Sequence, residues 1–316
     1  MSHLVGRGGL LLAWGLVIVL FAALEPDTFL TAANFQTIFG SQAVLVVLTL
    51  GLLVPLTAGD YDLSVAAVLS LSSMIVAVLN AEHGWPVGVA IVVAIAAGVT
   101  AGAVHGAIIV LLAVDPFVVT LGSGTFISGL VLWISGSNTI GGISTALVDP
   151  VVTRTFLGIP LAFYYGLALC AVLWFVLELT PTGRRLLFVG KSRRVSRLSG
   201  VRVGRLRWGA FVAASTISAL AGVLYAGTTG GADPSSGGTF LLPAFAAAFL
   251  GATSIAPGRF NPWGSVIAVY FLVTGITGLQ LAGVGSFVQQ LFYGGALIFA
   301  VVLSRLGRGR ELVEQD

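Results

Sequence analysis

The chain has 316 residues, of which 57% are hydrophobic and only 9% are charged, and it contains 42 glycines. A soluble domain carries roughly a quarter of its residues as Asp, Glu, Lys and Arg, so this composition excludes a water-soluble enzyme. The high hydrophobicity also excludes a disordered chain. The sequence therefore predicts an all-α, polytopic membrane protein whose residues 1–316 form a single transmembrane domain.

The apolar runs are continuous and rich in Leu, Val and Ala, which excludes the alternating pattern of a transmembrane β-barrel. Crossing the hydrocarbon core takes about 20 apolar residues, and about ten stretches of the chain come close to that length. In chain order, the predicted transmembrane helices cover 8–24, 38–57, 63–81, 86–112, 117–135, 162–180, 208–227, 240–256, 263–280 and 286–304.

The distribution of Lys and Arg predicts the orientation. With ten spans, fourteen of the 15 basic residues fall on one side of the membrane, and only Arg154 falls on the other. Basic residues accumulate on the cytoplasmic side of membrane proteins. Both termini are therefore predicted to be cytoplasmic.

Two features of the spans predict how the helices pack and bend. Gly98, Gly102 and Gly106 recur every fourth residue in the fourth span, a spacing that lets two helix backbones approach closely. Packing inside the subunit is favoured over a role in dimerisation. Pro55 and Pro243 lie inside spans and predict kinked or broken helices.

A polar cluster, Ala58–Ser64, separates the second and third spans. Asp60 and Asp62 lie close to the hydrocarbon, where carboxylates are costly. Capping of the third span is favoured over direct contact with a solute. Asp60, Asp62, Ser64 and His105, which lies inside the fourth span, are the candidates for a solute pathway or for capping. No spacing in the sequence indicates a catalytic residue, a bound cofactor or a metal site.

The predicted cytoplasmic segment 181–207 contains nine basic residues and no acidic residue. Val195, Leu198 and Val201 recur every third residue with arginines between them, which predicts a short amphipathic helix beside the membrane. A purely topological basic loop that touches anionic lipid is the alternative. The apolar stripe favours a docking helix for a cytoplasmic partner.

The tripeptide Gly190-Lys191-Ser192 resembles part of a phosphate-binding loop. A phosphate-binding loop requires a further glycine five residues before Gly190, the glycine that precedes the lysine. Position 185 holds Arg185 instead. The chain therefore lacks an ATP-binding loop, and any ATP that drives the protein must bind to another chain.

In their order and predicted topology, these residues resemble one family, the permease subunits of bacterial ABC importers of the ribose, xylose, galactoside and autoinducer-2 type. The similar segments are Gly59–Val65, Asp115–Gly122, Thr182–Gly183–Arg184 with Gly190 and Leu198–Val201, and Leu250–Ser254 with Gly258–Arg259. The chain departs from the family pattern at Ala66, His105, Lys191, Val195, Ser196 and Ala252.

The resemblance implies a non-catalytic subunit of an importer in the bacterial inner or plasma membrane, for a monosaccharide or a related small polar solute. It implies alternating access by two permease subunits, identical or different, with separate ATPase subunits that bind ATP and Mg and an extracytoplasmic solute-binding protein. It implies no nucleic-acid partner. The coupling helix would cover about Ser192–Ser199. The residues implied in coupling to the ATPase are Gly183, Arg184, Gly190, Arg194, Val195, Arg197, Leu198, Ser199 and Gly200.

Other classes remain open from the sequence. A secondary carrier would need no ATPase and would favour inverted repeats with broken helices. An ABC permease for branched-chain amino acids or nucleosides would share the architecture, and a non-transporting membrane scaffold would need no docking segment.

Overall fold

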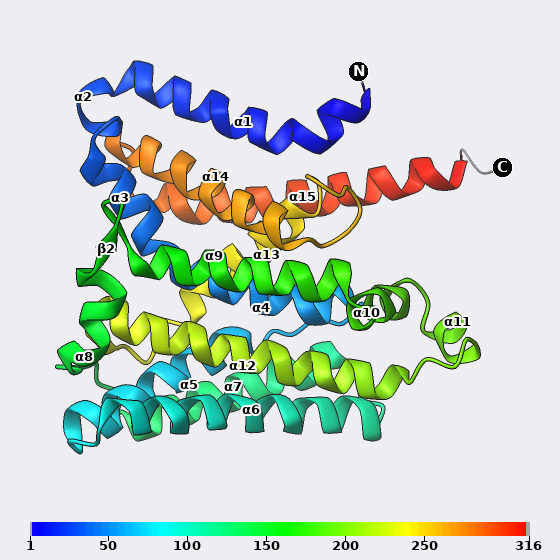
Figure 1. Cartoon of the computed structure of the whole chain (residues 1–316), viewed down its shortest axis with the longest axis horizontal. Helices are drawn as coiled ribbons and strands as arrows, with labels where there is room; N and C mark the ends of the chain where they lie inside the picture. The colour runs from blue at the N-terminus through cyan, green and yellow to red at the C-terminus, as the bar shows by residue number, and fades with distance from the viewer. Residues whose placement is uncertain (1, 314–316) are drawn as a thin grey trace.

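The computed structural model describes residues 2–313, and the side chains of residues 8–302. The helices lie side by side along one direction, and the short helices α10 and α11 lie together at one end of the bundle (Figure 1). The side chains of Arg7, Arg305, Arg308 and Arg310, which contributed to the predicted orientation, fall outside the described part.

The first half of the chain is almost continuous helix. Its elements are α1 (Ser2–Leu24), α2 (Pro26–Phe29), α3 (Ala32–Ser41), α4 (Ala43–Thr57), α5 (Val65–Ala77) with the π-helical turn η1 (Val78–Glu82), α6 (Val87–Leu111), α7 (Pro116–Ile134), and α8 (Thr145–Val148) with η2 (Asp149–Thr153).

The second half of the chain is also mostly helical. Its helices are α9 (Leu161–Trp174) with η3 (Phe175–Leu179), α10 (Pro181–Lys191), α11 (Arg193–Leu198), α12 (Val203–Thr229), α13 (Gly238–Gly251), α14 (Pro262–Leu281) and α15 (Phe287–Val313). Two antiparallel ribbons join the loops: β1 (Ile140–Gly141) pairs with β4 (Gly231–Ala232), and β2 (Thr155–Phe156) pairs with β3 (Ile159–Pro160).

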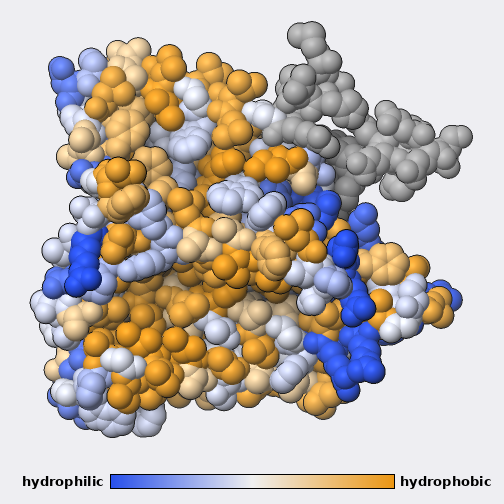
Figure 2. All heavy atoms as spheres, in the orientation of Figure 1, coloured by the Kyte–Doolittle hydropathy of each residue, from blue (hydrophilic) through white to orange (hydrophobic). Residues whose placement is uncertain are grey.

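The prediction of a polytopic helical membrane protein is confirmed. Among the described residues, seven helical segments are long and apolar enough to cross a membrane, and three shorter apolar helices, Gly8–Leu24, Gly238–Gly251 and Phe287–Val302, coincide with the remaining predicted spans. Apolar side chains cover much of the flank of the bundle in Figure 2. The start of α1 and the end of α15 lie at the same end as α10 and α11 (Figure 1).

The bounds of several predicted spans differ in detail; the seventh, for example, begins at Val203 and not at 208. The second begins earlier than predicted, with α3, and the chain passes from α3 into α4 at Gln42. The eighth ends at Gly251, five residues before its predicted end at 256. At Gly251 an added Cβ would lie 2.5 Å from the amide nitrogen of Ser265, so the backbones of α13 and α14 are in close contact there.

Helix α4 is the centre of the core. All 15 of its residues are buried, which is expected of a helix that is apolar all round. It packs against α12 and α9 on some sides and against α13 and α14 on others. Pro55 and Pro243 lie inside the continuous helices α4 and α13, so neither span is broken at its proline.

The glycine pattern of the fourth span forms a contact within the chain. An added Cβ at Gly98 would lie 2.5 Å from the Cβ of Ala219, and one at Gly102 would lie 2.6 Å from the carbonyl oxygen of Phe211. An added Cβ at Gly106 would likewise collide with Trp208. The backbones of α6 and α12 therefore touch along this face, which confirms packing inside the subunit.

Replacement of Gly102 by alanine is expected to lower the free energy of unfolding by about 1–3 kcal/mol, because the new methyl group meets backbone atoms that cannot rotate away. Thermal unfolding of the purified protein in detergent measures the change. Gly88→Ala on the same helix is the matched control, because no described heavy atom lies within 4 Å of its added Cβ. Equal unfolding midpoints for the two variants would contradict the close contact.

Candidate functional site

Hydrogen bonds at the C-terminal end of α4 fix the start of the loop Ala58–Ser64, which connects α4 to α5. Gly59 adopts a left-handed conformation with φ of +76°. Its amide donates to the carbonyl of Leu56, and the amide of Asp60 donates to the carbonyl of Pro55, each at 3.0 Å. This Schellman arrangement satisfies the last carbonyls of the helix and directs Asp60 away from the helix axis.

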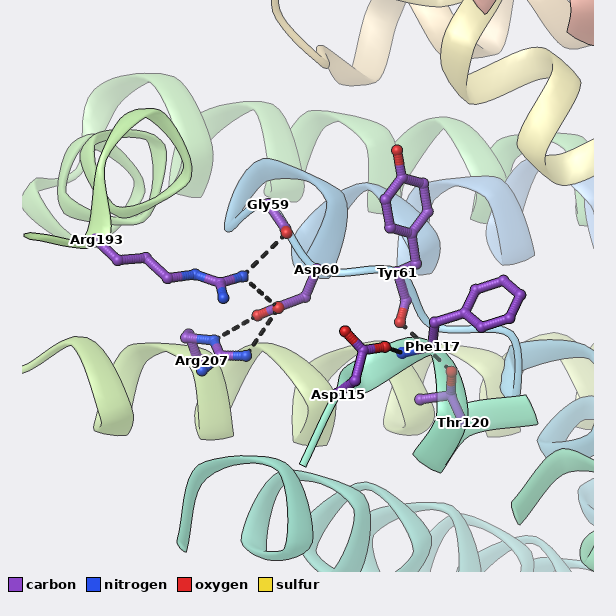
Figure 3. Close-up of polar contacts among 8 residues, drawn as sticks. All are labelled: Gly59, Asp60, Tyr61, Asp115, Phe117, Thr120, Arg193 and Arg207. Atoms are coloured by element: carbon purple, nitrogen blue, oxygen red, sulfur yellow. Dashed lines mark hydrogen bonds and ion pairs between the residues drawn. The ribbon is translucent and has the colours of Figure 1, made fainter. Parts of the chain in front are cut away.

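Asp60 accepts hydrogen bonds from two arginines that follow it by more than 130 positions in the sequence (Figure 3). Nε and Nη2 of Arg207 lie 2.7 and 2.9 Å from its two carboxylate oxygens, and Nη2 of Arg193 lies 2.6 Å from Oδ1. The same Nη2 of Arg193 donates to the carbonyl of Gly59 at 3.1 Å. We call these three charged residues the Asp60 cluster.

Burial explains why two cations gather here. The side chain of Asp60 is 1% exposed, that of Arg207 is 11% exposed, and that of Arg193 is 39% exposed. A carboxylate that has lost its water needs paired charge and hydrogen bonds in exchange. Asp60 thus acts as an anchor between α11 and α12, which differs from the predicted roles of span cap or solute contact.

Asp62 lies in the same loop and is fully buried. Its Oδ1 accepts from the amide of Ser64 at 3.0 Å and from the hydroxyl of Ser64 at 2.5 Å. Ser64 is the residue before α5, and no side chain caps the first amides of that helix. Asp62 therefore stabilises the turn before α5, and the predicted capping of the helix itself is not seen. Within the described residues, Oδ2 of Asp62 has no hydrogen-bond partner.

Ser64 connects this carboxylate to the fourth span. Its Oγ lies 3.2 Å from Nδ1 of His105, and because the hydroxyl donates to Asp62, Nδ1 must be the donor in this contact. His105 is 2% exposed. The structure therefore brings together Asp62, Ser64 and His105, three of the four pathway or capping candidates, and separates them from Asp60, whose partners are arginines.

Burial raises the pKa of Asp62 from its ordinary value of 3.8 to about 6, and the hydrogen bonds from Ser64 partly oppose that shift. Between pH 3.8 and about 6, Asp62 keeps its proton in the folded state but has lost it in the unfolded chain. The free energy of unfolding therefore falls as the pH rises through this range.

Asp62→Asn cannot titrate, yet its amide oxygen still accepts from Ser64. The unfolding midpoint of this variant, measured relative to that of the unchanged chain, is expected to rise as the pH increases from about 4 to about 6 and then to level off. Thermal unfolding across a pH series measures this difference. A difference that stays constant over the series would contradict the raised pKa.

The loop also contacts α7 and α13. Thr120 of α7 accepts from the amide of Leu63 at 3.1 Å, and Asp115 caps the start of α7 by accepting from the amide of Phe117 at 2.9 Å (Figure 3). On the other side, the ring of Tyr61 stacks on Phe245 and Phe249 of α13, with centroids 6.4 and 6.5 Å away.

Helix α10 packs onto the end of α4. An added Cβ at Gly183 would collide with the backbone of Leu177, and one at Gly190 would collide with the carbonyl oxygen of Thr57. Two of the three glycines in the predicted coupling set, Gly183 and Gly190, thus allow close backbone contacts inside the chain. Arg184, from the same set, is exposed.

Helix α11 agrees with the predicted coupling helix at about Ser192–Ser199. The hydroxyl of Ser192 caps its start by accepting from the amide of Val195 at 3.3 Å. Gly200, with φ of +76°, ends it in a second Schellman arrangement. Val201 therefore lies beyond the helix, and the predicted apolar stripe is reduced to Val195 and Leu198.

The outer face of α11 is apolar and basic. Val195 is 48% exposed and Leu198 is 81% exposed. The other exposed residues of the predicted coupling set on or beside α11 are Arg194, Arg197, Ser199 and Gly200. Ser196, by contrast, is buried. Hydrophilic side chains gather at this end of the molecule in Figure 2.

The pairing of Asp60 with two arginines was missed by the sequence analysis. A signal for it exists: Asp60 is an acid on the predicted cytoplasmic side, where almost all of the cations lie, and a buried acid needs a cation. The sequence offers nine basic residues in 181–207, and spacing alone does not select Arg193 and Arg207 among them.

Asp60→Asn is expected to lower the free energy of unfolding by about 3 kcal/mol, because it leaves Arg207 buried without a counter-charge. Arg193→Gln should cost less, since that side chain is the more exposed partner. Asp115→Asn is the matched control: this acid is exposed and only caps a helix, a role that asparagine also fills. Equal destabilisation by Asp60→Asn and Asp115→Asn would contradict the anchoring role.

The fold is an apolar helical bundle with a buried ionic anchor and an exposed amphipathic helix at one end, as expected of a membrane-embedded protein. Residues 34–301 match the family described as branched-chain amino acid transport system / permease component, and the chain belongs to that family. It is a multi-pass protein of the inner membrane.

Relatives of known function agree with this class. The chain is 34% identical over 290 residues to the ribose import permease protein of Bacillus subtilis, covering 92% of this chain and 90% of that one. It is 30% identical to the D-allose transport system permease protein of Escherichia coli, covering 92% and 89%. It is also 30% identical to the autoinducer 2 import system permease protein of Salmonella typhimurium, covering 81% and 78%. No solved structure matches the chain.

Proposed function

We propose that this chain is the permease subunit of an ATP-binding-cassette importer for a monosaccharide or a chemically similar neutral solute. The observation that carries the proposal is helix α11, which exposes Val195 and Leu198 at one end of the bundle while Arg193 at its start is held by the buried Asp60. A surface that offers apolar side chains to a partner and is fixed to the membrane core can pass a partner's movement to that core.

ATP binding belongs to separate subunits in this proposal. The Gly190-Lys191-Ser192 sequence lies at the end of α10 and in the cap of α11, and it does not follow a strand as a phosphate-binding loop does. ATPase subunits that bind ATP and Mg would therefore dock on α10 and α11. Their nucleotide states would shift the permease between outward and inward forms by binding one form more tightly than the other.

The remaining partners follow from the proposed transport cycle. A second permease subunit would complete the pathway, and an extracytoplasmic solute-binding protein would deliver the solute to the end of the bundle opposite α11. The family description names branched-chain amino acids, whereas two of the relatives above import or transport ribose and D-allose. The sugar class is preferred because of those relatives.

Leu198→Glu tests the docking surface. A charge at the centre of an apolar contact is expected to weaken the association of the ATPase subunits by about tenfold or more, and to reduce solute-stimulated ATP hydrolysis in the reconstituted complex correspondingly. Leu112→Glu is the matched control, because Leu112 is 69% exposed at the end of α6 and lies outside the coupling segment.

Full ATPase association and full stimulation in Leu198→Glu would overturn the role of α11. Accumulation of solute against a gradient by the purified chain alone, in sealed vesicles, would overturn the importer proposal and favour a secondary carrier.

A further inference from the structure

A crevice of about 260 Å³ lies among α3, α13, α14, α15 and the start of α4. Its position along the bundle follows from α14, which begins after a loop whose Arg259 pairs with Glu178 of η3 at 3.2 Å. Helix α14 thus starts at the end that carries α10, and Gln280 near its finish marks the opposite end. The crevice lies toward the end from which a delivered solute would enter.

The lining of the crevice is polar without being charged. Seven of the twelve lining residues carry a hydroxyl or a carboxamide, the other five are apolar, and none is Asp, Glu, Lys, Arg or His. Such a site offers hydrogen-bond donors and acceptors but no counter-charge for an ammonium or a carboxylate group. It suits a neutral solute better than a zwitterionic amino acid.

Four of these polar groups are available to a ligand. The side chains of Thr277, Gln280, Gln289 and Tyr293 make no hydrogen bond to another protein group within the described part of the chain. Thr274, three residues before Thr277 in α14, differs in that its hydroxyl donates to the carbonyl of Tyr270 at 2.6 Å.

The apolar side of the crevice includes the ring of Phe240, which is also packed edge-on against Tyr225. An aromatic ring beside hydroxyl and amide groups matches a sugar, which presents C–H groups on one face and hydroxyl groups around its edge. The cavity volume corresponds to roughly nine liquid waters, which suits a single sugar ring.

We propose that this crevice is a weak binding site for one neutral monosaccharide at the outer end of the permease, and that Gln280 and Gln289 are its main hydrogen-bonding groups. The proposal rests on the proposed function and deepens it, because it places discrimination between a sugar and an amino acid in this chain as well as in a solute-binding protein. Each carboxamide both donates and accepts, so it can pair with neighbouring sugar hydroxyls in either direction.

The test measures binding of D-ribose, D-allose and L-leucine at millimolar concentration to the purified full-length chain in lipid nanodiscs, by saturation-transfer NMR. We expect D-ribose or D-allose to bind and L-leucine to give no signal. Gln289→Leu keeps the side-chain size and removes the amide, and should weaken sugar binding about three- to tenfold. Gln290→Leu, an exposed neighbour on α15 outside the crevice, should leave binding unchanged.

Two results would overturn the proposal: unchanged sugar binding in Gln289→Leu, or binding of L-leucine in preference to both sugars. If Gln289→Leu fails to fold, Tyr293→Phe, which removes one oxygen from the crevice, takes its place with the same expected loss. If only the crevice proposal is wrong, ATPase subunits still dock on α11 while sugar binding does not depend on Gln289. If only the importer proposal is wrong, ATPase docking is lost while sugar binding still depends on Gln289.

Discussion

Asp60 is 1% exposed, and a carboxylate in that position is tolerated only when cations and hydrogen bonds replace its lost hydration. Arg207 of α12 supplies a bidentate contact, and Arg193, the first residue of α11, supplies a single hydrogen bond from Nη2. These ion pairs therefore couple the position of α11 to the core. Any displacement of α11 must either break a short ion pair or move the loop that carries Asp60.

That loop is in contact with several membrane helices at once. Ser64 meets His105 of α6, Thr120 of α7 accepts from the amide of Leu63, and Tyr61 stacks on α13. Helix α13 also lines the outer crevice through Phe240. The proposed docking surface and the proposed sugar site lie toward opposite ends of the bundle, and Ala58–Ser64 together with α13 forms a continuous run of packed residues between them. Alternating access requires a linkage of this physical kind between two distant sites.

Close backbone contacts make the linkage stiff. Gly190 of α10 lies against Thr57 at the end of α4, and Gly98 and Gly102 bring α6 against α12. Interfaces packed at this distance shift as units because they lack flexible side chains that could absorb a displacement. The faces of α6, α7 and α9 that do not pack inward expose apolar side chains such as Val92, Phe126 and Val172, as helices in contact with lipid do.

The sequence by itself determined the class of fold, the approximate spans, the glycine contact of the fourth span and a short helix near Ser192–Ser199. Each of these depends on local patterns: apolar length, residue spacing, and the Ser and Gly signals at helix ends. Tertiary structure alone decided which cations pair with Asp60 and that residues from five helices form one uncharged polar crevice. Those features join residues more than a hundred positions apart, and local periodicity carries no information about which distant side chains a buried charge or an unpaired amide will meet.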